Sequence, residues 1–243
     1  MSIAVQLKKA EIGYDYFSVL KNLSLKIEHG DFCLIVGPNG SGKSTLMKSM
    51  IGVNPLRKGK VYLDGELIQN YRHWDHIGYL PQRNSNIHPL FPATVLDIVK
   101  MGANGKEDRI EKAMDIFELN TIRNRMIGEL SGGQYQRTLL ARTLASPRKM
   151  VFLDEPNAAL EPRIRERFHK ELERLHEQEH LTIVYVTHDI GEVHHCATHL
   201  IYVDREILFD GSLKDFCLSD NISSHFGSHT QHTVCHQHKH KNL

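Results

Sequence analysis

The stretch "GPNGSGKST", residues 37 to 45, follows the apolar run "FCLIV" and precedes "LMKSMI". It matches the pattern GxxxxGK[ST], which indicates a phosphate-binding loop when a buried strand precedes it and a helix follows it. Glycines in such a loop let backbone amides curl around phosphates, and the N-terminus of the helix adds a positive dipole end. The sequence therefore predicts a phosphate-binding loop made of Gly37, Pro38, Asn39, Gly40, Ser41, Gly42, Lys43, Ser44 and Thr45.

Two side chains of this loop have distinct expected roles. Lys43 should reach the β- and γ-phosphates of a nucleoside triphosphate, and the Ser44 hydroxyl should ligate Mg²⁺. The alternative is a glycine-rich turn of purely structural use, which the strand and helix on either side disfavour.

A second motif, "MVFLDEP" at residues 150–156, places Asp154 and Glu155 at the end of an apolar run. In open α/β sheets ligands bind at the carboxyl ends of the strands. Neighbouring strand residues point to opposite sides, so the two carboxylates should differ in role. We expect Asp154 to join the Mg²⁺ shell and Glu155 to polarise the attacking water. A plain turn at the strand end is the other interpretation.

A third motif, "LSGGQYQR" at residues 130–137, predicts the start of a helix. Ser131 is suited to cap that helix, and Gly132 and Gly133 leave bare amides at its positive end, which makes a second phosphate-binding nest. On these residues alone, a capped helix without a ligand is the favoured interpretation.

The remaining pattern indicates an α/β core with a helical insert. Apolar runs at 32–37, 76–81, 149–156, 181–188 and 199–204 predict buried strands of a parallel sheet. Helical segments separate several of them, and one carries an apolar stripe of Ile164, Phe168, Leu172 and Leu175. Residues 84–146 predict mainly helix, ending before Pro147, and after Asp220 the chain becomes polar, as in a tail without a core.

Composition limits the classes of protein and of partner. The 243 residues carry 30 Lys plus Arg against 29 Asp plus Glu, so there is no basic excess to indicate nucleic acid. No apolar run approaches the ~20 residues that span a bilayer, and the N-terminus lacks the layout of a signal peptide. Four cysteines without CxxC spacing, one of them Cys33 in an apolar run, fit a reducing compartment and a reduced core thiol.

Taken together, these motifs resemble the nucleotide-binding subunit of an ABC transporter over residues 3–226, with "LSGGQ" at residues 130–134 matching the family signature unchanged. The resemblance implies a P-loop NTPase (RecA-like) α/β core with a parallel sheet, an N-terminal antiparallel β portion and an inserted helical subdomain. The implied boundaries are a cassette over 1–220, with the core at about 1–83 and 147–220 and the helical subdomain at about 84–146. Residues 221–243 are left as a histidine-rich tail.

The resemblance also assigns roles to residues that would otherwise be unremarkable. Gln82 in "YLPQ" matches the family's Q-loop glutamine, a contact to Mg²⁺ and water. His188 in "VTHD" matches the switch histidine that hydrogen-bonds the γ-phosphate. Tyr14 matches the aromatic residue that stacks on adenine, with Tyr16 and Phe17 as alternatives.

The implied assembly is a head-to-tail dimer of two copies. Each ATP would lie between the loop 37–45 of one copy and Ser131, Gly132, Gly133 and Gln134 of the other. Integral membrane permease subunits and an extracytoplasmic metal-binding protein complete the expected system. The expected location is the cytoplasmic face of a bacterial inner membrane, with no nucleic acid bound.

One residue departs from the family pattern. The sequence has "NAALEP" where "SALD" is common, so Glu161 stands in place of Asp. The extra methylene changes reach but not charge, which puts the contact between the two ATP sites in doubt more than hydrolysis itself.

Two segments bear on the cargo. "FPATVLDIVKMG" at residues 91–102 resembles a segment of zinc, manganese and iron importer ATPases. "NISSHFG" at residues 221–227 resembles the end of zinc and manganese importer ATPases. Zinc is the leading interpretation, and manganese or an iron chelate is the alternative. A non-transport ABC ATPase acting on DNA or ribosomes would be expected to carry coiled coils or two cassettes, which this chain lacks.

The tail offers imidazole and thiolate donors, which suit Zn²⁺. Their irregular spacing argues against a fixed tetrahedral site. Loose metal binding, a polar tail without function, and a response to pH all remain open. The candidate ligands are His229, His232, Cys235, His236, His238 and His240.

Overall fold

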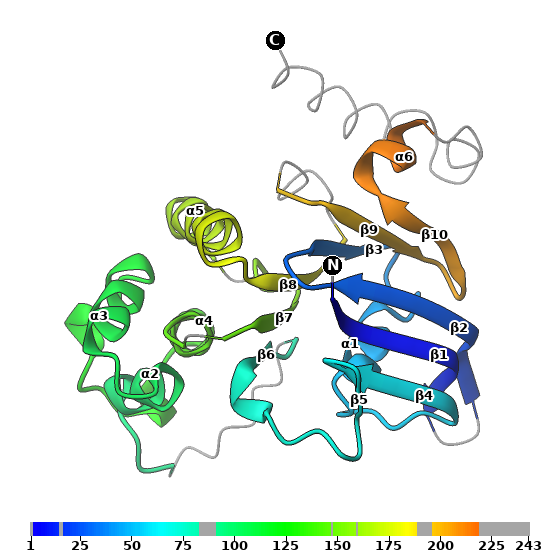
Figure 1. The fold of residues 1–243 in the computed structure, drawn as a ribbon. Helices are drawn as coiled ribbons and strands as arrows, with labels where there is room; N and C mark the ends of the chain where they lie inside the picture. Colours follow the sequence, from blue (N-terminus) through cyan, green and yellow to red (C-terminus); the bar gives the residue numbers. More distant parts are fainter. Residues whose placement is uncertain are drawn as a thin grey trace. The chain divides into compact units, whose positions relative to one another are not determined.

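The computed structural model describes residues 2–14, 17–82, 91–146, 148–158, 160–188 and 196–218. The chain forms two compact units, the first made of residues 1–72 and 182–243 and the second of residues 73–181 (Figure 1). The boundaries predicted from the sequence, 84 and 146 for the helical subdomain, remain a prediction.

The first unit contains the expected antiparallel portion. Four strands lie in the order β2-β1-β4-β5, and each neighbouring pair is antiparallel. In β2, Leu23, Leu25 and Ile27 are buried while Ser24 and Lys26 are exposed, the period-two pattern of a sheet with one buried face. The strands are β1 (Ile3–Tyr14), β2 (Phe17–Glu28), β4 (Lys58–Leu63) and β5 (Glu66–Leu67).

The parallel strands of the first unit surround β3. This strand pairs in parallel with β8 and with β9, and all five of its residues are buried, as a strand covered on both faces requires. Strand β10 pairs antiparallel with β9 and was not anticipated from the sequence. The elements are β3 (Phe32–Val36), α1 (Lys43–Met50), β8 (Thr182–Thr187), β9 (His199–Val203), β10 (Ile207–Ser212) and α6 (Leu213–Leu218).

Two groups on these strands are perturbed by burial. Burial raises the pKa of the Cys33 thiol well above its usual value, which fits the expected reduced core cysteine. Burial would lower the pKa of His199, but its hydrogen bonds with Asp210 and Asp31 outweigh that effect and raise the pKa to about 9. The Nε2 to Asp210 Oδ1 distance is 2.6 Å, and Nδ1 lies 3.5 Å from Asp31 Oδ2. The imidazolium thus ties β9 to β10 and to the residue before β3.

The second unit combines two parallel strands with helices. Strands β6 and β7 pair in parallel. Helices α2, α3 and α4 pack against one another, in green in Figure 1, and lie in the region predicted to be helical. The elements are η1 (Trp74–His76), β6 (Ile77–Leu80), α2 (Val95–Ala103), α3 (Glu107–Ile116), η2 (Asn120–Ile122), η3 (Ile127–Glu129), α4 (Gly132–Leu144), β7 (Met150–Asp154) and α5 (Pro162–Glu179), where η marks a 3₁₀ turn.

Helix α5 follows the sequence pattern closely. Its predicted apolar stripe, Ile164, Phe168, Leu172 and Leu175, is buried. Pro162 stands at the first helical position, where a missing amide hydrogen costs nothing. Ion pairs from Lys112 to Glu171 (2.8 Å) and from Arg109 to Glu179 (2.9 Å) join α3 to α5.

The approach of α2 to α4 is close at one glycine. A Cβ atom added to Gly102 would lie 1.9 Å from the Arg142 carbonyl oxygen, so only glycine fits there.

Among the described residues, no helix combines the length and the apolar character needed to cross a lipid bilayer.

Candidate nucleotide-binding and hydrolysis site

The phosphate loop connects β3 to α1 as the sequence predicts. Gly42 is the N-cap of α1 and adopts a left-handed conformation with φ of 108°. Gly37 leaves β3 so close to Val203 that a Cβ atom would lie 1.9 Å from the Val203 carbonyl oxygen. Pro38, Asn39 and Gly40 are exposed at the tip of the loop. The loop therefore presents backbone to solvent at the N-terminus of a helix, which is a place suited to anions.

Side chains inside the loop fit a phosphate ligand. Lys43 is only 5% exposed, and its Nζ donates hydrogen bonds to the carbonyl oxygens of Gly37 and Pro38, each at 2.9 Å. These bonds hold the ammonium group in the loop. The buried Ser41 hydroxyl has no hydrogen-bond partner among the described residues. A buried hydroxyl without a partner is costly, and an acceptor such as a phosphate oxygen would satisfy it.

Tyr14 lies beside the start of α1. Its hydroxyl accepts a hydrogen bond from Thr45 Oγ1 at 3.4 Å, and its side chain is 48% exposed. An exposed aromatic side chain tethered to the phosphate loop is suited to stack on a base. Phe17 is exposed as well, at 81%, and Tyr16 lies outside the described residues.

His188 follows the last residue of β8 and is exposed. Like Gly37 to Thr45, it belongs to the first unit. The carboxyl end of a parallel strand is where the open α/β architecture positions ligand-binding side chains.

The second unit contains the two carboxylates. Asp154, the last residue of β7, is fully buried, whereas Glu155 is partly exposed. Glu155 has a positive φ of 48°, a conformation that is uncommon for a non-glycine residue and costs energy. The two neighbouring side chains thus differ in exposure, in agreement with different roles for them.

Gln82 and Glu155 are brought together by the pairing of β6 with β7. Gln82 Nε2 donates a hydrogen bond of 3.0 Å to Glu155 Oε2, across 73 residues of sequence. The sequence indicated each residue separately but not this bond. Gln82 therefore orients the carboxylate that is the candidate general base.

The signature segment forms the expected cap of α4. The Ser131 hydroxyl accepts from the Gln134 amide at 3.3 Å, and Gln134 Oε1 accepts from the Ser131 amide at 3.1 Å. This reciprocal capping box leaves the first-turn amides of Gly132 and Gly133 without side chains over them. Ser131 and Gly132 are exposed, so a ligand can reach the helix end.

Glu161, the departure from the family pattern, is the N-cap of α5 and its side chain makes no capping hydrogen bond. It is exposed, so its carboxylate is accessible from solvent. The predicted tail ligands, from His229 to His240, lie outside the described residues.

The β3–loop–α1 motif, the paired carboxylates after β7 and the capped glycine pair of α4 define a P-loop ATPase of the α/β class. The chain belongs to the ABC transporter family, because that family's model matches residues 20–158. It is an ATP-hydrolysing cassette, and the cassettes of this family bind ATP with Mg²⁺.

Several relatives and several solved structures match most of the chain. It is 33% identical over 227 residues to the zinc uptake system ATP-binding protein ZurA of Listeria innocua, covering 89% of this chain and 88% of the relative. It is 38% identical over 212 residues to the high-affinity zinc uptake system ATP-binding protein ZnuC of Bacillus subtilis, covering 83% and 91%. It is 32% identical over 244 residues to the manganese transport system ATP-binding protein MntA of Synechocystis, covering 93% of each.

One of these structures is the dimeric post-hydrolysis state of the ATP-binding cassette MJ0796 bound to ADP and Pi. The two folds superpose with a TM-score of 0.72 at 29% identity, covering 86% of this chain and 98% of that one. The predicted P-loop α/β fold is therefore confirmed.

Proposed function

We propose that this chain is the ATP-hydrolysing subunit of a divalent-metal importer whose cargo is zinc. The assignment of zinc as the cargo rests on the similarity to two zinc-uptake ATP-binding proteins over more than four fifths of the chain. Because a manganese transport ATP-binding protein is also similar to this chain, manganese is the second candidate for the cargo.

In this proposal the first unit binds the nucleotide. The loop amides and Lys43 hold the phosphates, Tyr14 stacks on the base, and His188 contacts the γ-phosphate. The two carbonyl oxygens that hold Lys43 Nζ keep the ammonium group pointing into the loop before the nucleotide arrives. A preformed cation of this kind lowers the reorganisation that accompanies phosphate binding.

The second unit supplies Gln82, Asp154 and Glu155 for hydrolysis. Ser44, Gln82 and Asp154 are the proposed contacts of Mg²⁺, which neutralises charge on the phosphates when bound. Glu155 accepts the proton of the attacking water, and its hydrogen bond with Gln82 keeps the carboxylate oriented. Ser131, Gly132, Gly133 and Gln134 bind the ATP held by a second copy, so that ATP stabilises the dimer.

The proposed contact with the permease subunits lies around α2. Phe91 precedes this helix, Met101 is in its last turn, and Met126 forms a bridge with its N-cap Thr94. These residues are 43%, 63% and 36% exposed, and apolar residues exposed together on one surface mark interaction sites. Peripheral attachment at the cytoplasmic face of the membrane, with an extracytoplasmic metal-binding protein delivering the cargo, follows from this proposal.

The cargo is tested by deleting the gene for this chain from its source organism and limiting metals with a chelator. We expect a growth defect that Zn²⁺ relieves and that Mn²⁺ and iron do not. A plasmid copy of the wild type should restore growth, whereas Glu155→Gln should not. Rescue by manganese or iron alone would reassign the cargo, and rescue by no metal would refute metal import.

The non-transport alternative is tested on the purified chain. Hydrolysis stimulated by DNA or ribosomes, together with failure to recover any membrane protein on pull-down from detergent extracts, would refute the transport function. We expect the pull-down to recover a multi-span permease instead.

A further inference from the structure

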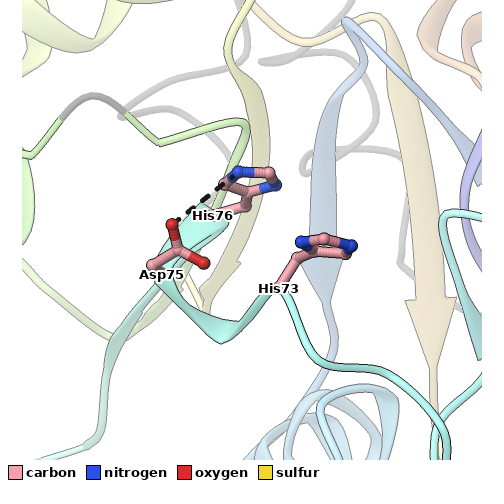
Figure 2. A group of neighbouring side chains, drawn as sticks. All are labelled: His73, Asp75 and His76. Atoms are coloured by element: carbon pink, nitrogen blue, oxygen red, sulfur yellow. Dashed lines mark ion pairs between the residues drawn. The ribbon is translucent and has the colours of Figure 1, made fainter.

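Three potential metal ligands meet just before β6, outside the proposed ATP site. His73, Asp75 and His76 each offer one ligand atom, and these atoms all lie within 4.8 Å of one another (Figure 2). The group lies at the start of the second unit. None of the motifs assigned to nucleotide binding includes it.

The local backbone explains why the two imidazoles meet. The amide of His76 donates to the carbonyl oxygen of His73 at 2.9 Å, which closes the 3₁₀ turn η1. Side chains three residues apart eclipse one another in such a turn. The rings of His73 and His76 are accordingly stacked, with centroids 5.3 Å apart and planes 12° from parallel.

The turn is fixed from a distant part of the sequence. The Arg148 guanidinium donates to the carbonyl oxygens of Asp75 and Ile77, at 3.1 and 2.6 Å, and the Lys149 amide donates to that of His76 at 3.0 Å. The three backbone positions are thus held in place, while the side chain of Asp75 remains 72% exposed. A rigid backbone with adjustable side chains is suited to an exchangeable ion.

His76 has unused bonding capacity. Its Nδ1 is buried without a hydrogen-bond partner among the described residues, and its Nε2 lies 3.8 Å from Asp75 Oδ2, beyond hydrogen-bond distance. Buried polar atoms without partners are rare in proteins. A bound ion would give one of the two ring nitrogens a partner. Figure 2 shows the carboxylate of Asp75 turned toward this ring.

We propose that His73, Asp75 and His76 form a surface site for a late transition metal ion, with Zn²⁺ the best fit. Two imidazoles and a carboxylate, with water in the fourth position, are a common zinc donor set. Ligand atoms around a tetrahedral zinc ion are about 3.3 Å apart, so the side chains need to close by up to about 1.5 Å, which the exposed side chains of His73 and Asp75 allow. Two nitrogen donors disfavour Mg²⁺ and Ca²⁺, which select oxygen. The neighbouring Arg148 cation favours an exchangeable ion over a permanent one.

A fluorescent side chain next to the site can report metal binding. Trp74, between His73 and Asp75, is the chain's single tryptophan and is 45% exposed. A paramagnetic ion such as Co²⁺ bound by its neighbours should quench its fluorescence. The measurement uses the full-length chain, and the variants separate this site from ions bound elsewhere.

The test titrates Co²⁺ into the wild type and into His73→Gln, Asp75→Asn and His76→Gln, with His180→Asn as the matched control. His180 is an exposed imidazole outside the cluster, in a left-handed conformation that Asn tolerates. We expect saturable quenching that Zn²⁺ reverses and Mg²⁺ does not. The Co²⁺ midpoint should rise about tenfold or more in both His→Gln variants, less in Asp75→Asn, and not in His180→Asn.

Quenching with the same midpoint in both His→Gln variants as in the wild type would overturn the proposal, as would reversal by Mg²⁺ or the absence of saturable quenching in the wild type. Circular dichroism of each variant checks that the fold is retained. Because His73 is exposed, its substitution should have little effect on stability. The outcome does not depend on the cargo, so failure of zinc import in the deletion strain and failure of this site are separate results.

Discussion

At the scale of single residues, the proposed general base is the side chain that follows β7. Glu155 combines a positive φ of 48° with a hydrogen bond of 3.0 Å from Gln82. Strain of this kind persists only where surrounding contacts enforce it, and such positions cluster at functional sites. The buried neighbour Asp154 has no comparable access to solvent. Of the two adjacent carboxylates, Asp154 is therefore buried and Glu155 is partly exposed to solvent.

Glu155→Gln tests the general base. The amide has a similar shape but cannot accept the proton of water, so turnover should fall by about 10²- to 10⁴-fold while ATP binding is retained. Gel filtration with ATP should show a trapped dimer. Glu166→Gln, on the exposed surface of α5, is the control and should hydrolyse ATP at the wild-type rate. Unchanged turnover in Glu155→Gln would show that another group is the base.

His199 gives a pH dependence of stability. Its pKa in the folded chain is about 9, above the ordinary value of 6.5, so its stabilising effect is complete below pH 6.5 and is lost as pH rises through 9. The shift corresponds to about 3 kcal/mol. Urea unfolding of wild type and His199→Gln should show a gap in free energy at pH 6 that shrinks by about this amount at pH 9.5. A gap that is equal at both values would contradict the ion-pair explanation.

At the scale of elements, capping and close packing shape the helical part of the second unit. Helix α4 begins with the Ser131–Gln134 capping box, and α2 begins with a second one between Thr94 and Asp97. Each satisfies amide groups that the first turn leaves open. The two helices then approach closely at Gly102. Local hydrogen bonds thus fix where each helix starts, and a missing side chain fixes how near they come.

Gly102→Ala tests that approach. Alanine normally stabilises a helix by about 0.5–1 kcal/mol relative to glycine. Here its methyl group would overlap the Arg142 carbonyl oxygen, and overpacking costs about 1–3 kcal/mol. We therefore expect net destabilisation of about 1–2 kcal/mol by urea unfolding. Met101→Ala, an exposed neighbour on the same helix, should change stability by less than about 0.5 kcal/mol. A more stable Gly102→Ala chain would refute the close approach.

At the scale of the whole molecule, the motifs are divided between two units. The phosphate loop and His188 belong to the first, and Gln82, Asp154, Glu155 and the signature belong to the second. The exposed apolar residues near α2 belong to the second as well. A transporter subunit needs both an ATP site and a surface for its permease, and this chain offers candidates for each.

Met101→Asp tests the permease surface. A charge on an apolar contact should weaken association, so metal uptake in the complemented strain should fall several-fold while ATPase activity of the isolated chain is unchanged. Lys100→Asp, one residue away and also exposed, is the control for added negative charge. Equal uptake by Met101→Asp and wild type would place the permease contact elsewhere.

Truncation after Phe226 tests the histidine-rich tail. Basal ATP hydrolysis should be unchanged, because the predicted ATP-site residues all precede position 189. If the tail binds cargo metal exchangeably, uptake at limiting zinc should change with it. Unchanged uptake would assign the tail no role in transport.

The sequence by itself determined the features that depend on neighbouring residues. The phosphate loop, the capped start of α4 and the apolar stripe of α5 each follow from spacings of a few residues, and all appear in the structure at the predicted places. The tertiary structure alone decided three others: the hydrogen bond from Gln82 to Glu155, the grouping of His199 with Asp31 and Asp210, and the anchoring of η1 by Arg148. These contacts join residues far apart in sequence or on paired strands, so strand order and register bring them together, and no local spacing encodes them.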